Sequence, residues 1–281
     1  MTEALDILYI LAHPDDESFG HAGTMILANE MNFRVGYICA TRGEAGEIRD
    51  PKLSSRAALG ARRELELRNA MDLVGLDELR IMSYRDSGMD GTEQNNDPRC
   101  LMQADEDELT AFLVAAIREL KPKSVVTFGP DGVYGHPDHI RIGKIADRAV
   151  IEAAGDGEPG LGEPWRAEAF YHVAAPRERM IAGRNNPESP YYNQPLEAFE
   201  KLGNPSEDVT HWIDSKSVMD RKYDVLMQHA TQIGEDNPIR DKASEIGQMF
   251  LSVETLLRVD LPWDENSSDP ITQIRDAHPA K

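Results

Sequence analysis

The first 154 residues alternate short apolar runs with longer helical stretches, and this alternation constrains the fold more than any other feature. The first run, residues 5–12 (LDILYILA), is almost continuously apolar. Such a run is typical of a parallel strand, because helices cover both faces of a parallel sheet. The order predicts an α/β fold with a mostly parallel sheet flanked by helices, and active residues at the carboxyl ends of its strands. Strands are expected at 5–12, 34–40, 79–82 and 123–128, and helices at 23–31, 54–74, 106–120 and 137–154.

The remaining residues are expected to form a second part of the chain. Residues 155–165 are rich in glycine and proline, which is typical of a linker or an excursion. We therefore divide the chain into a catalytic core, residues 1–154, and a mixed α/β extension, residues 155–281, that packs on the core and contributes to the substrate pocket. The extension is expected to hold strands at 169–174 and 253–259, helices at 215–229 and 238–250, and a poorly ordered polar tail from Pro262.

Turn chemistry adds two expectations for the core. Ser54 or Ser55 is the expected cap of the helix at 54–74, and Gly75 is its expected end. Residues 83–104 show no periodicity and are rich in glycine, asparagine and aspartate. A loop this long inside a compact domain is usually either functional or disordered.

Composition excludes several classes of function. The formal net charge of −20 repels phosphate backbones and anionic membranes, so neither nucleic-acid binding nor membrane binding is expected. Two cysteines, Cys39 and Cys100, are too few for a disulfide scaffold and fit a reducing compartment. The acidic first residues do not resemble a signal peptide, and no apolar run approaches the roughly 20 residues of a membrane span. We expect a soluble cytoplasmic protein with a small-molecule partner, and homo-oligomerisation stays open.

The tripeptide His-Pro-Asp occurs twice, each time after a predicted strand. The copies are His13-Pro14-Asp15, followed by Asp16, and His136-Pro137-Asp138, followed by His139. A single copy is most often a helix cap or a turn. Two copies, each with a further ligand type three residues after its histidine, favour a metal site. The other histidines have no such neighbours and are interpreted as surface or core residues; they are His21, His172, His211, His229 and His278.

These residues can be given roles in a hydrolytic zinc site, which takes three protein ligands and a water. The ligands would be His13, Asp16 and His139. A water bound to such an ion is acidic near neutral pH, so a non-ligand carboxylate, Asp15, can act as its general base. His136 as an imidazolium would stabilise the tetrahedral oxyanion and give a proton to the leaving amine. Asp138 would orient one of the histidines, and Tyr134 would donate a further hydrogen bond.

The two motifs together resemble those of the PIG-L/LmbE-like metal-dependent de-N-acetylases. Residues 41–47 (TRGEAGE) look like the family's T-x-G-E-x-G-E loop, and Arg63 and Glu66, followed by Gly75, match its R-x-x-E…G helix. Residues 85–89 (RDSGM) resemble a segment of the mycothiol-pathway members. The resemblance covers residues 5–154 and is closest to the deacetylases of mycothiol and bacillithiol biosynthesis.

The resemblance implies a Rossmann-like fold and metal-dependent hydrolysis of the N-acetyl group of an N-acetylglucosamine conjugate, by attack of a metal-bound water. It implies Zn²⁺ as cofactor, with Fe²⁺ as the alternative, and the same ligands and catalytic residues named above. Arg63, Asp86 and Glu47 are then expected to contact the substrate. For Arg63 the other interpretation is an ion pair with Glu66 on the helix surface, and for Asp86 it is a loop turn.

Three competing functions stay open. A related branch of the family cleaves the amide of thiol conjugates, of the mycothiol type. Two histidines and a carboxylate also form the metal site of non-haem Fe(II) oxygenases, although those ligands are commonly carried on all-β folds. A non-catalytic sugar-binding protein is the third alternative, and it would not need Asp15.

Overall fold

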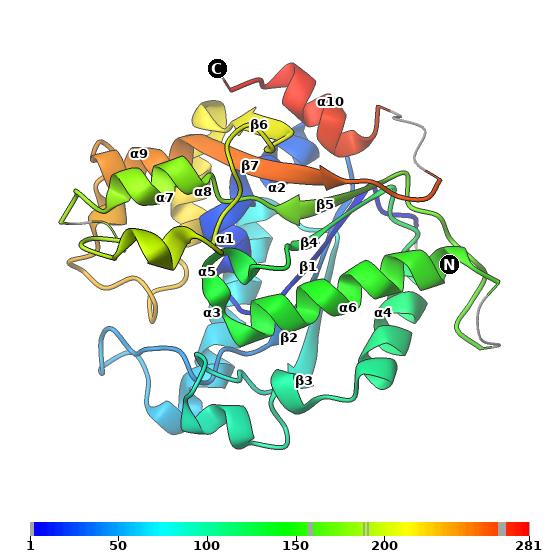
Figure 1. Ribbon diagram of the computed structural model, residues 1–281, viewed down its shortest axis with the longest axis horizontal. Helices are drawn as coiled ribbons and strands as arrows, with labels where there is room; N and C mark the ends of the chain where they lie inside the picture. Colours follow the sequence, from blue (N-terminus) through cyan, green and yellow to red (C-terminus); the bar gives the residue numbers. More distant parts are fainter. Residues whose placement is uncertain (1–2, 157–159, 188, 190, 264–267, 281) are drawn as a thin grey trace.

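The computed structural model describes residues 3–156, 160–187, 189, 191–263 and 268–280 (Figure 1). Its centre is a sheet with the strand order β3-β2-β1-β4-β5-β7-β6. The neighbours from β3 to β5 pair in parallel, and β7 runs antiparallel to both β5 and β6. The strands are β1 (Ile7–Leu11), β2 (Val35–Thr41), β3 (Glu78–Tyr84), β4 (Ser124–Phe128), β5 (Ala169–Val173), β6 (His211–Asp214) and β7 (Val253–Val259). The predicted mostly parallel α/β sheet is confirmed.

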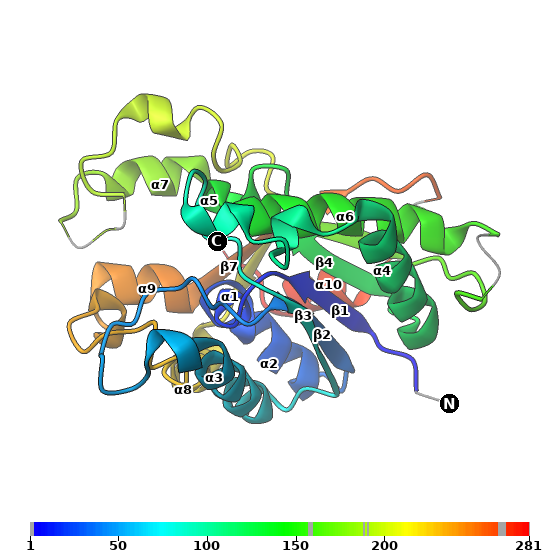
Figure 2. The ribbon, with the colours of Figure 1, turned by 90° about the horizontal axis from the view of Figure 1, so that it is seen from below.

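Helices cover both faces of this sheet (Figure 2). One face carries α4 (Glu106–Leu120) and α6 (Pro137–Ala154), and the other carries α2 (Ala22–Glu30), α3 (Leu59–Val74) and α8 (Met219–Leu226). Because both faces are covered, every residue of β1 is buried, which explains its continuous apolar sequence. The shorter helices are α1 (Asp16–Gly20), α5 (Gly132–Gly135), α7 (Arg177–Gly183), α9 (Glu245–Ser252) and α10 (Pro270–Ala277).

The strand order places a topological switch point between β1 and β4. The chain moves from β1 outward through β2 to β3, and then returns to the other side of β1 to form β4. The loops that leave β1 and β4 therefore diverge, and ligands of open α/β sheets bind in the crevice that this creates. His13 follows β1 and His136 follows β4. The sheet thus brings together two motifs that are more than 120 residues apart in the chain.

A glycine sets the distance between α6 and β4. A Cβ atom added at Gly143 would lie 2.4 Å from the carbonyl oxygen of Phe128, the last residue of β4. Only a glycine lets the helix backbone come this close to the strand. His139 lies one turn earlier on α6, and its ring stacks on Phe128 with the ring centroids 3.9 Å apart. The position of His139 therefore depends on the close packing at Gly143.

Several expected elements were wrong in detail. α3 begins at Leu59 after a short 3₁₀ helix, Arg56–Ala58, and Ser55 makes no side-chain capping hydrogen bond. The expected helix at 215–229 forms regular α-helix only over α8, because a 3₁₀ turn (Lys216–Val218) precedes it and non-helical backbone follows. The expected helix at 238–250 likewise divides into a 3₁₀ turn, Pro238–Arg240, and α9.

The prediction of a poorly ordered tail was wrong for residues 268–280, and residues 264–267 lie outside the described part of the chain. α10 forms there because Asp269 caps it, accepting the main-chain N–H of Ile271 at 2.9 Å. The hydroxyls of Ser124 and Tyr171 donate to the same carboxylate from the sheet. These partners come from distant parts of the chain, so no local pattern indicates them. The sequence also failed to indicate α7 and β6, which are short.

Candidate metal centre and catalytic residues

His13, Asp16 and His139 bring possible ligand atoms close to one another at the switch point. Nδ1 of His13 lies 3.2 Å from Nε2 of His139, and that atom lies 3.3 Å from Oδ1 of Asp16. Nδ1 of His13 and Oδ2 of Asp16 are 3.6 Å apart. Tetrahedral ligands at about 2.0–2.1 Å from a zinc ion stand about 3.3–3.4 Å from one another. The three residues predicted as ligands are therefore brought together, with Oδ1 of Asp16 facing His139 and Oδ2 facing His13.

The second nitrogen of each of these histidines faces a hydrogen-bond acceptor. Nε2 of His13 lies 3.1 Å from Oδ2 of Asp138, and Nδ1 of His139 lies 3.2 Å from the carbonyl oxygen of Gly132. Each acceptor requires a proton on the nitrogen that faces it, which leaves the lone pair on the nitrogen that faces the other possible ligand atoms. The N–H of Ser87 in turn donates to Asp138 at 2.9 Å. Asp138, expected to orient one of the histidines, lies behind His13.

Two other groupings of possible ligand atoms are present among the described residues: His13 with His136 and His139, and His13 with Asp86 and Asp138. Their atoms are already engaged. Asp86 accepts the N–H groups of Gly88 and Ala45 at 2.8 and 3.2 Å. Nδ1 of His136 accepts the N–H of Asp138 at 3.2 Å, so its proton is on Nε2 and neither nitrogen offers a lone pair. Oδ2 of Asp16 also accepts main-chain N–H groups, those of Ala12 and His13 at 3.1 and 2.7 Å. Oδ1 of Asp16, which faces His139, accepts no hydrogen bond from the described residues and is the carboxylate oxygen left for a metal ion.

Buried carboxylates make the centre attractive to a cation. Burial by itself would raise the pKa of Asp16, but the imidazoles of His139 and His13 hold that pKa well below its usual value. For Asp86, too, burial opposes ionisation, and His13 nevertheless lowers its pKa. Both carboxyl groups are therefore ionised near neutral pH. Together with Asp138, they surround His13 with negative charge, which a bound metal ion would offset.

Asp15 lies beside the ligand set without belonging to it. Its φ angle is 110°, a left-handed conformation that costs a non-glycine residue roughly 1–3 kcal/mol and is found mostly at functional sites. Its Oδ2 lies 3.1 Å from Nη2 of Arg63, which also donates to the carbonyl oxygens of Pro14 and, through Nη1, Gly43. Burial raises the pKa of Asp15 to about 6, while Arg63 acts in the opposite direction. A carboxylate with such a pKa suits a general base near neutral pH.

His136 differs from the expected imidazolium. It caps α6, with Nδ1 accepting the N–H of Asp138, and this bond requires a neutral ring with its proton on Nε2. Burial lowers the pKa of His136 to about 3. The ring can donate one hydrogen bond through Nε2, but as a neutral imidazole it is a poor general acid.

Tyr134 lies over the two histidines of the second motif. Its ring centroid is 5.0 Å from that of His139 and 6.0 Å from that of His136, and 43% of the residue is exposed. The preceding Val133 has φ 68° and ψ −56°, a strained γ-turn conformation that is rare for a β-branched residue. The strained turn presents the exposed tyrosine ring to the centre.

The three residues expected to contact substrate have different surroundings. Asp86 is buried, with Oδ1 3.6 Å from Nε2 of His13. Arg63 is buried against Asp15, and the alternative pairing with Glu66 is wrong because Glu66 pairs with Arg62 at 3.0 Å instead. Glu47 is exposed and pairs with Arg49 at 2.7 Å. None of the three lines the cavity beside the centre.

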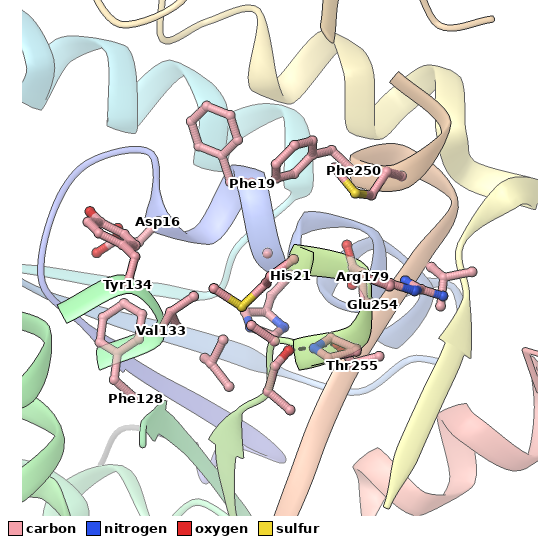
Figure 3. A pocket seen from close by; sticks show the side chains of 18 of the residues that line it. Asp16, Phe19, His21, Phe128, Val133, Tyr134, Arg179, Phe250, Glu254 and Thr255 are labelled. Atoms are coloured by element: carbon pink, nitrogen blue, oxygen red, sulfur yellow. Dashed lines mark hydrogen bonds between the residues drawn. The ribbon is translucent and has the colours of Figure 1, made fainter. Parts of the chain in front are cut away.

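A cavity of about 540 Å³ opens beside the candidate metal ligands Asp16 and His139 (Figure 3). It runs from Asp16 and Tyr134 past His21 toward Arg179 and Glu254. Much of its lining is apolar, including Phe19, Val133, Val173, Met180 and Phe250. Residues of β5, α7, α9 and β7 form part of the wall, so the C-terminal half of the chain encloses the space next to the candidate catalytic residues.

Known proteins identify the family. A family model described as "PIG-L: GlcNAc-PI de-N-acetylase" matches residues 8–150. The chain is also 36% identical over 271 residues to the 1D-myo-inositol 2-acetamido-2-deoxy-alpha-D-glucopyranoside deacetylase of Geodermatophilus obscurus, covering 90% of this chain and 92% of that protein. The chain belongs to the PIG-L family. The resemblance seen in the sequence is thus confirmed, and the protein is a de-N-acetylase that hydrolyses an amide C–N bond.

Solved structures of the same fold carry more than one reaction. The N,N'-diacetylchitobiose deacetylase of Pyrococcus horikoshii has a TM-score of 0.62 and 20% identity, with coverage of 91% of this chain and 84% of that chain. The 4-carboxy-2-hydroxymuconate hydratase of Pseudomonas putida has a TM-score of 0.59 and 21% identity, with coverage of 95% and 100%. At such identities the likeness shows the fold alone. The PIG-L chemistry rests on the family match.

Sequence reasoning missed two residues that support the PIG-L site. Glu17 directly follows the first motif and is fully buried, with its carboxylate on the N–H of Asp15 at 3.0 Å. His229 is also fully buried and lies 2.7 Å from Glu17. Glu17 directly follows Asp16 in the chain, so its place beside the first motif is a local signal. His229 is more than 200 residues away and has no local signal.

Proposed function

We propose that this protein removes the acetyl group from an N-acetylglucosamine conjugate. The observation that carries this proposal is the cluster of Nδ1 of His13, Nε2 of His139 and Oδ1 of Asp16, with the carboxylate of Asp15 beside it. The relative from Geodermatophilus is named as the deacetylase of such a conjugate with inositol. We assign Zn²⁺ to the three ligands, with Fe²⁺ as the alternative ion. We also propose that the protein acts in the cytoplasm.

A bound metal ion would supply an acidified water and a positive charge beside the developing oxyanion. Asp15 takes the proton of the attacking water, and its raised pKa matches that task. His136 donates a hydrogen bond to the oxyanion through Nε2–H, and Tyr134 donates a second one through its hydroxyl group. Because His136 is neutral, we assign to Asp15 the return of the proton to the leaving amine. We also propose that Asp86 and Glu47 contact the substrate, as the family resemblance implies.

Arg63 is better placed to hold Asp15 than to meet a sugar. Its guanidinium pairs with the carboxylate of Asp15 and donates hydrogen bonds to the carbonyl oxygens of Gly43 and Pro14. An arginine engaged in this way fixes the orientation of the carboxylate that it pairs with. We therefore propose that Arg63 positions the base, in place of the substrate contact expected from the resemblance.

The experiment is an amine-release assay with several N-acetylglucosamine conjugates, run on metal-depleted protein and on the same protein restored with Zn²⁺ or Fe²⁺. We expect release to disappear on depletion and to return with the ion. Undiminished release after complete depletion would contradict the metal site. Turnover that requires oxygen would instead favour the oxygenase alternative, and binding without any turnover would favour a sugar-binding protein.

The apolar cavity supports a second candidate, hydrolysis of the amide of a thiol conjugate. Inositol presents hydroxyl groups around its ring, whereas Phe19, Met180 and Phe250 offer no hydrogen bonds. An apolar group carried on a thiol would bury its surface against these side chains. The two functions separate in a comparison of kcat/KM on N-acetylglucosamine conjugates and on amides of thiol conjugates that bear apolar groups.

A further inference from the structure

A buried carboxylate holds the main chain of Asp15 from behind. Oε2 of Glu17 accepts the main-chain N–H of Asp15 at 3.0 Å. Oε1 of the same carboxylate accepts the hydroxyl of Ser18 at 2.5 Å and lies 2.7 Å from Nε2 of His229. Glu17 and His229 are both fully buried. One carboxylate thus connects the proposed base to a histidine from the C-terminal half of the chain.

The conformation of Asp15 explains why such support is needed. A non-glycine residue at φ 110° is strained, and it keeps this conformation only where several contacts hold it there. Its carbonyl oxygen accepts the N–H groups of Ser18 and Phe19 in the first turn of α1, and its carboxylate meets Arg63. Its N–H has Glu17 as its partner. Release of Glu17 would therefore free the peptide that sets the direction of the Asp15 side chain.

Among the described residues, the side chain of His229 has polar contacts only with Glu17 and Ser18. Nε2 faces Glu17 and Ser18, and Nδ1 is buried without a hydrogen-bond partner. Burial acts to lower the pKa of His229, but the charge of Glu17 outweighs it and leaves that pKa raised. The ring therefore donates to Glu17. Neither residue lines the cavity, so neither contacts a substrate there.

The turn that carries His229 is itself fixed to the core. Thr231 donates through its N–H and its hydroxyl to the carboxylate of Glu66 at 3.1 and 2.7 Å. Its carbonyl oxygen accepts the N–H of Arg49 at 3.0 Å. Glu66 is on α3, the helix that also carries Arg63. The two supports of Asp15, one on its side chain and one on its main chain, are thus tied to the same helix.

We propose that His229 is a positioning residue of the hydrolytic reaction, which acts through Glu17 to keep Asp15 in its left-handed conformation beside the metal ligands. The assignment rests on the proposed base role of Asp15. It gives the C-terminal half of the chain a part in catalysis in addition to enclosing the cavity. Outer-shell partners of this kind typically change activity by roughly 10–100-fold when they are replaced.

The test compares three replacements of His229 in the metal-loaded enzyme. His229→Gln keeps an N–H donor near the position of Nε2, His229→Asn places its amide near Nδ1, and His229→Leu has no donor. We expect kcat to fall roughly 10–100-fold in the Asn and Leu variants, with KM and metal content within about twofold of the wild type. The Gln variant should recover most of kcat. Rescue by Gln but not by Asn is a result that a mere packing role would not give.

His211→Gln is the matched control. His211 is another buried histidine of the C-terminal half. Its partners, Thr210, Tyr171 and Thr272, make no contact with Asp15. We expect this variant to keep the kcat of the wild type. If the Leu variant does not fold, the Gln and Asn pair still decides. Equal kcat in Gln, Asn and wild type, or equal losses in Gln and Asn, would overturn the inference, whereas an inactive wild type would overturn the proposed function itself.

Discussion

Nε2 of His13 lies 3.1 Å from Oδ2 of Asp138, and this contact decides which nitrogen of His13 is free to bind a metal ion. A proton on Nε2 leaves the lone pair on Nδ1, the atom 3.2 Å from Nε2 of His139. The second histidine motif therefore contributes twice to the centre. Its aspartate orients a candidate ligand from the first motif, and its final histidine is itself a candidate ligand.

Asp138→Asn should weaken metal binding while leaving the three ligands in place. The asparagine keeps the shape of the aspartate but loses the charge that holds the proton of His13 on Nε2. We expect metal affinity to fall roughly 10–100-fold, the usual effect of losing an outer-shell partner. Competition titration against a chromogenic chelator measures this affinity. Unchanged affinity would show that Asp138 does not select the tautomer of His13.

Asp15→Asn should separate metal binding from catalysis. Because Asp15 is beside the ligands but is not one of them, the variant should keep the metal content of the wild type. An amide cannot accept the proton of water, so kcat should fall roughly 10²–10⁴-fold. Metal analysis and steady-state kinetics on one preparation check both parts. A variant with normal kcat would remove Asp15 from the base role, and a variant without metal would make it a ligand.

His21 should make the fold sensitive to acid. Burial lowers the pKa of His21 to about 4, so the folded protein binds this proton less readily than the unfolded chain, whose histidines titrate near 6.5. The neutral His21 side chain therefore contributes fully to the free energy of unfolding above pH 6.5, and this contribution is lost as the pH falls toward 4. A shift of this size corresponds to roughly 3 kcal/mol.

His21→Phe provides the comparison for this loss. The phenyl ring keeps the contact with Tyr9, whose ring centroid is 5.6 Å from that of His21, and it cannot be protonated. Neither ring nitrogen of His21 has a hydrogen-bond partner among the described residues, so the change removes no hydrogen bond to them. Urea unfolding at pH 7 and pH 5 should show a smaller loss of free energy of unfolding in the variant. Equal losses would show that His21 does not titrate as expected.

Gly143→Ala should disturb both the packing of α6 and the position of His139. The added methyl group would lie 2.4 Å from the carbonyl oxygen of Phe128, so the helix must move away from β4. Overpacking of this kind costs about 1–3 kcal/mol of stability. We expect a lower melting temperature and weaker metal binding. Gly155→Ala is the control, because a Cβ there makes an ordinary contact of 3.6 Å with the oxygen of Glu152.

The sequence by itself determined the α/β class and the chemistry of the centre. Continuous apolar runs such as that of β1 predict buried parallel strands, and two histidine motifs at strand ends predict a shared site, because carboxyl ends of parallel strands meet at one edge. His13, Asp16 and His139 follow from residue type and spacing together with the family resemblance. Local patterns suffice for these features, since strand burial and ligand chemistry are encoded in adjacent residues.

Only the tertiary structure decided how these residues are protonated and held. The neutral state of His136 depends on a hydrogen bond from Asp138, and the orientation of Asp15 depends on Arg63 and Glu17. The partner of Glu17, His229, lies more than 200 residues along the chain. α10 forms in a polar tail because Ser124 and Tyr171 satisfy its cap. Each of these outcomes depends on burial and on partners from distant segments, which no local pattern in a single sequence contains.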